Sequence, residues 1–93
     1  MPDARVTRRL SVPENVVFEV LDGEAVLLNL TAGVYFGLNP TGTRVWELLR
    51  EHPTRDGIRR AMLEEFDVEP AALDRDLDEL FGELLSRGLL IEE

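Results

Sequence analysis

The feature that most constrains the fold is a short aromatic strand that runs directly into a capped helix, within residues 34–49. The segment 34–38 reads VYFGL, and its β-branched and aromatic side chains favour an extended, half-buried strand. Asn39 is a good helix N-cap, and Pro40 suits the first helical position, where its missing N–H costs no hydrogen bond. The sequence therefore predicts a strand that ends at a sharply defined helix start.

Two more strands are predicted before this junction, over Val16–Leu21 and residues 25–30. The dipeptide Asp22-Gly23 between them is typical of a tight β-hairpin turn. Gly33 closes a second short turn, since glycine adopts a positive φ without strain. We expect a three-stranded antiparallel sheet in which each strand pairs with the next.

Three helices are predicted after the sheet. The first runs from Pro40 to about residue 51, and the second begins at the cap residue Thr54. The third covers about residues 70–87, with apolar side chains at three- and four-residue spacing, and Gly88 is its expected left-handed cap. This order predicts an α+β fold of the winged helix-turn-helix type, with the sheet first and the helices after it.

We expect one folded domain over residues 16–93, preceded by residues 1–15 as an N-terminal arm or an extra strand. A chain of 93 residues has room for a single small core. It contains no cysteine, which excludes disulfides and thiolate metal sites. There is no signal peptide and no apolar run of membrane-spanning length, so we expect a cytoplasmic protein without a membrane partner.

The net charge of −9 is concentrated in the last third of the chain. Residues 1–63 carry eight acidic residues and eight arginines, whereas residues 64–93 carry eleven acidic residues and only Arg75 and Arg87 as cations. Such a surface repels phosphate backbones and favours a partner that carries lysine or arginine. We therefore expect no nucleic-acid partner.

No pattern of residues predicts catalysis or a cofactor. The only histidine, His52, has no second histidine to share a metal, and the glycines lack the spacing of a nucleotide-binding loop. Carboxylates four residues apart on the third helix, such as Asp74 and Asp78, are explained as well by a solvated helix face. We expect a protein that is not an enzyme and binds neither metal nor cofactor.

Three segments in this order resemble the PqqD-like family of peptide-recognition elements: residues 25–30, residues 35–49 and the sequence RGLL at residues 87–90. The resemblance spans about residues 16–90. It implies a free-standing protein that binds the leader region of a ribosomally made precursor peptide and delivers it to tailoring enzymes. The expected enzyme partners are a leader peptidase and a cyclase, as in lasso-peptide biosynthesis, or a radical enzyme.

The same resemblance implies a binding site between the third strand and the third helix. The leader would add a strand beside residues 34–38, and its side chains would enter pockets against the helix. Leu73, Leu77 and Leu80 would form the floor, and Asp76 and Glu83 would pair with a basic leader residue. The full set of candidate peptide-binding residues is Val34, Tyr35, Phe36, Gly37, Leu73, Asp76, Leu77, Leu80, Glu83 and Leu84.

Two other interpretations stay open. A winged-helix DNA-binding regulator has the same order of elements, and its one basic surface would be Arg55, Arg59 and Arg60 on the second helix. Alternatively, the chain scaffolds an enzyme through its first helix or its acidic face. Phe36 and the neighbouring Leu38 are explained equally well as parts of a small core.

Overall fold

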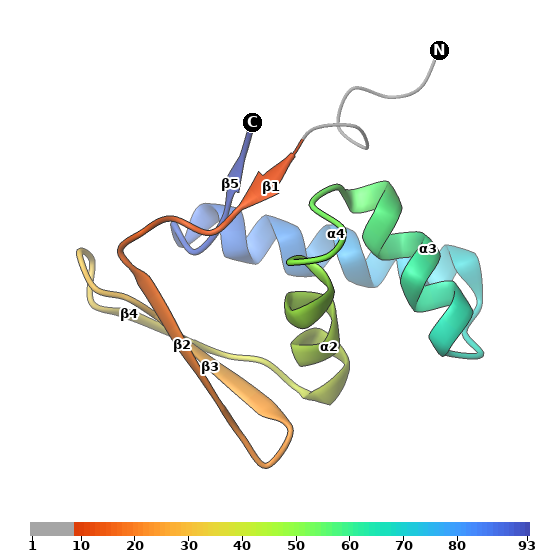
Figure 1. Cartoon of the computed structure of the whole chain (residues 1–93), viewed down its shortest axis with the longest axis horizontal. Helices are drawn as coiled ribbons and strands as arrows, with labels where there is room; N and C mark the ends of the chain where they lie inside the picture. The colour runs from red at the N-terminus through yellow and green to blue at the C-terminus, as the bar shows by residue number, and fades with distance from the viewer. Residues whose placement is uncertain (1–8) are drawn as a thin grey trace.

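The computed structural model of the chain describes residues 9–93. Within them the three-stranded sheet lies on one side and three helices gather on the other (Figure 1). The elements in chain order are β1 (Leu10–Ser11), β2 (Val16–Leu21), β3 (Glu24–Asn29), β4 (Val34–Gly37), α2 (Pro40–Leu48), α3 (Arg55–Glu65), α4 (Pro70–Ser86) and β5 (Ile91–Glu92).

The predicted α+β fold is confirmed, and its sheet has the order β2-β3-β4 with antiparallel neighbours. Asp22 and Gly23 both have positive φ, at 54° and 79°, as the tight hairpin turn requires. Gly33, with φ 69°, closes the second turn. In consequence β4 lies at an edge of this sheet and pairs only with β3 within residues 9–93.

The first two helices begin at the caps that the sequence predicted. The Asn39 side chain accepts a hydrogen bond from the Gly42 N–H at 2.7 Å, and the Thr54 hydroxyl accepts one from the Gly57 N–H at 3.1 Å. The first helix, expected to reach residue 51, ends at Leu48, because the following turn tightens into i→i−3 bonds from the N–H groups of Arg50 and Glu51. None of the helices in residues 9–93 is long and apolar enough to cross a membrane.

The core lies between one face of the sheet and the helices. Leu27 of β3 is fully buried, as are Ile58 of α3 and Leu89 after α4. Trp46 of α2 is buried too, and its ring meets the Phe18 ring edge to face at 5.7 Å between centroids. The only tryptophan is therefore part of the core.

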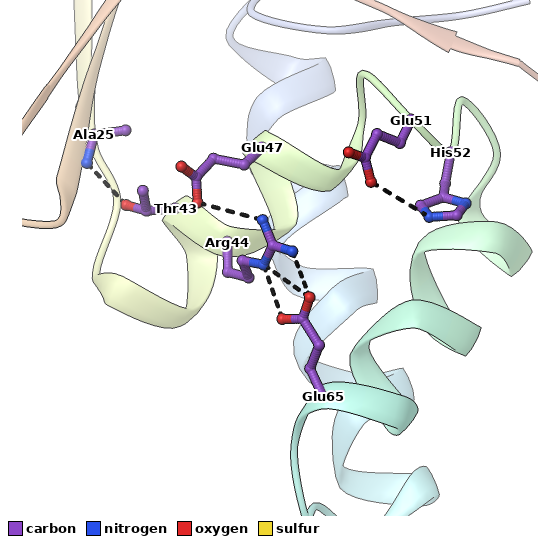
Figure 2. Close-up of polar contacts among 7 residues, drawn as sticks. All are labelled: Ala25, Thr43, Arg44, Glu47, Glu51, His52 and Glu65. Atoms are coloured by element: carbon purple, nitrogen blue, oxygen red, sulfur yellow. Dashed lines mark hydrogen bonds and ion pairs between the residues drawn. The ribbon is translucent and has the colours of Figure 1, made fainter.

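Two polar contacts fix α2 against its neighbours (Figure 2). The buried Thr43 hydroxyl accepts a hydrogen bond of 2.8 Å from the Ala25 N–H, which ties the start of α2 to β3. The Arg44 guanidinium pairs with Glu65 at the end of α3 and lies 3.8 Å from Glu47 of its own helix. The first contact holds α2 against the sheet, and the second holds it beside the last turn of α3.

The two ends of the described chain are joined in a second, two-stranded sheet. β1 pairs antiparallel with β5, and the Glu93 N–H donates to the Arg9 carbonyl at 2.8 Å. The Leu10 side chain is buried, and its N–H donates to the Pro53 carbonyl at 2.7 Å. Residues 10–11 thus form a strand apart from the main sheet. They belong to the segment 1–15, the expected arm or extra strand. Residues 1–8 of that segment lie outside the described part of the chain.

Candidate functional site

A groove of about 960 Å³ lies between the end of β4 and α4. The first turn of α2 closes one side through Asn39, Thr41 and Gly42. The end of α3 and the loop after it close another side through Met62, Phe66 and Val68. The junction between β4 and α2 thus forms part of the groove, and all three helices contribute to its walls.

The floor of the groove is apolar. Leu73 and Leu77 of α4 are each 5% exposed, and Leu80 is half-buried against the same core. Phe36 of β4 completes the floor on the strand side. An open apolar surface of this kind recognises the apolar side chains of a ligand.

The rim of the groove is acidic. Asp76, Asp78, Glu79 and Glu83 of α4 belong to the lining, which includes no lysine or arginine. Asp78 is paired with Arg55, and Glu83 accepts a hydrogen bond of 3.0 Å from Arg87. Asp76 and Glu79 have no ion pair with any residue in the described part of the chain. The groove therefore combines an apolar floor with an acidic rim, in which two of the four carboxylates have no cationic partner in the described part of the chain.

Beside the groove, β4 presents unpaired backbone groups. The Leu38 N–H donates to the Ala25 carbonyl at 2.8 Å, which places residue 38 in a hydrogen-bonded pair across from β3. Since the direction of these bonds alternates along an antiparallel strand, the backbone groups of Tyr35 and Gly37 face the open edge. Two residues of β4 thus offer N–H and C=O groups to an added strand.

Seven of the predicted site residues line the groove: Phe36, Gly37, Leu73, Asp76, Leu77, Leu80 and Glu83. The other three lie elsewhere. Leu84 is only 2% exposed and packs in the core, and Val34 is half-buried on β4 outside the lining. Tyr35 is 69% exposed, and strand alternation places its side chain on the sheet face opposite Phe36. The contribution of Tyr35 to a site at the groove is therefore its backbone.

A buried asparagine that sequence reasoning missed joins the two walls of the site. The Asn29 Oδ1 accepts hydrogen bonds from the N–H groups of Thr31 and Ala32, each at 3.1 Å. Its Nδ2 donates to the carbonyls of Arg87 and Gly88, at 3.2 and 3.3 Å. The turn before β4 and the end of α4 are thereby locked together. The signal in the sequence was a polar residue at an inward position of an apolar strand.

A second link between the walls is made by Arg87. Its guanidinium lies over the Phe36 ring, 5.0 Å from the centroid, while it also donates to Glu83. This contact holds Phe36 in place on the strand side of the groove.

The family model for PqqD, described as Coenzyme PQQ synthesis protein D, matches residues 24–90. The chain belongs to the PqqD family. The match includes β3, β4 and the three helices, and so contains every wall of the groove. A comparison of this PqqD-family chain with curated protein sequences found no match.

Two solved structures share the fold. One, described as TbiB1 in complex with the TbiA(beta) leader peptide, is 37% identical, with a TM-score of 0.78 over 85% of this chain and 92% of that one. The other, lasso peptide synthetase B1 complexed with the leader peptide, is 22% identical, with a TM-score of 0.77 over 89% and 98% of the two chains. The second likeness concerns the fold alone.

The basic surface that DNA binding would need is neutralised in this PqqD-family protein. Arg55 and Arg59 of α3 pair with Asp78 and Asp74 of α4, and Arg60 pairs with Asp56. The hydrogen bond from Arg59 to Asp74 also raises the pKa of that guanidinium. No comparison favours a DNA-binding regulator.

Proposed function

We propose that this PqqD-family protein binds the leader region of a ribosomally made precursor peptide by β-strand addition to β4. The observation that carries the proposal is the open backbone edge of Tyr35 and Gly37 beside an apolar groove. Backbone hydrogen bonds supply affinity that depends little on sequence, and side chains that enter the groove supply specificity. A relative that is 37% identical was solved with a leader peptide, which supports this choice of ligand.

In this proposal the protein is not catalytic and delivers the leader to other enzymes in the cytoplasm. Leu73, Leu77 and Leu80 receive apolar leader side chains, and Asp76 and Glu83 form the acidic rim. The proposed partners are a leader peptidase or another modifying enzyme, as membership of the PqqD family suggests.

The role of the strand edge is tested with two substitutions at one position. Tyr35→Pro removes an N–H that faces the open edge, where a proline is tolerated by the sheet, whereas Tyr35→Ala keeps that N–H. In a fluorescence-anisotropy titration with the labelled leader of the precursor encoded beside the gene, we expect Tyr35→Pro to weaken binding by about tenfold. Tyr35→Ala should bind within about twofold of wild type. Equal effects of the two substitutions would contradict strand addition at this edge.

The groove is tested with a matched pair of leucines. Leu80→Ser alters the half-buried floor, and we expect it to weaken leader binding by at least about tenfold. Leu30→Ser is the control, because Leu30 is 58% exposed and lies outside the groove. Circular dichroism checks that both variants are folded. Wild-type protein that binds no encoded leader would refute the proposed function itself.

A further inference from the structure

Gly82 interrupts α4 four residues before the helix ends, at a position that lines the groove. Glycine destabilises the interior of a helix relative to alanine, because it loses more backbone freedom on folding. The fold gives no reason for a glycine here. A Cβ added at Gly82 would meet nothing within 4 Å, and the residue is not among the glycines with positive φ. The missing side chain instead leaves a notch in the α4 wall of the groove.

The notch has a charged border. Glu79 lies one turn before Gly82 and Ser86 one turn after it, so all three follow one line along α4, and all three belong to the groove lining. Asp78 and Glu83, the other carboxylates near the notch, are already engaged by Arg55 and Arg87. Glu79 is the carboxylate at this notch with no ion pair in the described part of the chain.

We infer that Gly82 and Glu79 select a lysine or arginine of the leader peptide, an inference that rests on the proposed function. The aliphatic stem of the basic side chain lies in the notch over Gly82, and its cationic head meets the Glu79 carboxylate. Long cationic side chains bury their stems along apolar surface while the charge stays near water, which fits a notch open to solvent. The groove lining contains no lysine or arginine, and no residue in the described part of the chain forms an ion pair with Glu79.

The test is a double-mutant cycle between protein and leader. One peptide is the leader of the precursor encoded beside the gene, and the others replace each of its lysines and arginines in turn by methionine. For Glu79→Gln we expect binding of the natural leader to weaken by about two- to fivefold. One methionine peptide should bind wild type and Glu79→Gln equally. Glu64→Gln is the charge-matched control, because Glu64 lies on α3 outside the groove.

Gly82→Ala gives a second readout that a purely structural role would not produce. We expect the melting temperature to rise by about 3–6 °C, because alanine favours the helix, and leader binding to weaken by about fivefold. If Tyr35→Pro and Leu80→Ser weaken binding while Glu79→Gln and Gly82→Ala bind as wild type does, the notch is refuted and the leader-binding function stands. A leader that binds tightly without lysine or arginine, or equal losses for every methionine peptide, would also overturn the inference. If wild type binds no leader, the proposed function fails first.

Discussion

At the scale of single residues, Asn29 supports the candidate site although it does not line the groove. Asn29 is 6% exposed, and its amide uses both its acceptor and its donor groups to join the turn before β4 to the end of α4. Two features favour glycine at position 88. Its φ of 68° lies in the left-handed region, and an added Cβ would lie 2.8 Å from the Asn29 Nδ2. One buried amide therefore connects the turn before β4 with the end of α4, the two elements that flank the groove.

Asn29→Ala should lower the free energy of unfolding by about 2–4 kcal/mol, because it leaves buried backbone groups without partners. Urea denaturation monitored by Trp46 fluorescence measures the change. Thr31→Ala in the same turn is the control, and it should cost less than about 0.5 kcal/mol because Thr31 is exposed. A loss at Asn29 no larger than that at Thr31 would show that the amide does not hold the walls together.

At the scale of elements, the helices are fastened to one another by ion pairs on their outer faces. Arg44 of α2 meets Glu65 of α3, while Arg55 and Arg59 of α3 meet α4. The hydrogen bond from Arg44 lowers the pKa of the Glu65 carboxyl from its ordinary value of 4.5. A carboxyl whose pKa is lowered in the folded state stabilises the protein above its ordinary pKa, and this contribution is lost as the pH falls through the folded-state pKa.

We expect Glu65→Gln to be less stable than wild type at pH 7, with the difference shrinking as the pH falls below about 4.5. Urea midpoints at pH 7, 5 and 3 measure this convergence. Glu64→Gln removes a neighbouring charge that has no ion pair within residues 9–93, so it should show no such trend. A constant difference between Glu65→Gln and wild type at all three pH values would mean that the pair with Arg44 does not respond to protonation.

The sequence correctly predicted the turns and helix caps that depend on the preferences of a few neighbouring residues. The Asp22-Gly23 turn and the Asn39 cap each depend on the conformational preference of one or two residues, and the structure confirms both. The pairing of β1 with β5 could not be predicted, because two-residue strands from opposite ends of the chain carry no periodicity. Likewise, the role proposed for Gly82 could not be predicted, because only the groove shows which space its missing side chain leaves open.

The site that the family resemblance implied agrees best with the groove on α4, where Leu73, Leu77 and Asp76 all belong to the lining. The same set of residues included Leu84, which helix periodicity turns inward but which the core covers. On β4, the aromatic character of Tyr35 suggested a binding side chain, whereas the alternation of a paired strand turns it away from the groove.

At the scale of the whole molecule, the β1–β5 sheet joins the beginning and end of the described chain at a site separate from the groove lining. Deleting residues 91–93 removes β5 and the hydrogen bond to Arg9. We expect a loss of about 1–2 kcal/mol of stability, since only a few exposed backbone bonds disappear. Leader affinity should stay within about twofold of the full chain, as measured by the same anisotropy titration. A large drop in affinity in a folded truncated protein would show that the terminal sheet controls the groove.

This closure has a consequence for how the domain can be connected to other proteins. Because Arg9 and Glu93 are hydrogen-bonded neighbours, a few linker residues suffice to join them, and new ends can then be opened in a surface turn such as Asp22-Gly23. A circular permutant of this kind would keep β4 and α4 in place. For the same reason the domain can be inserted into a loop of a host enzyme, with both connections leaving from one point on its surface.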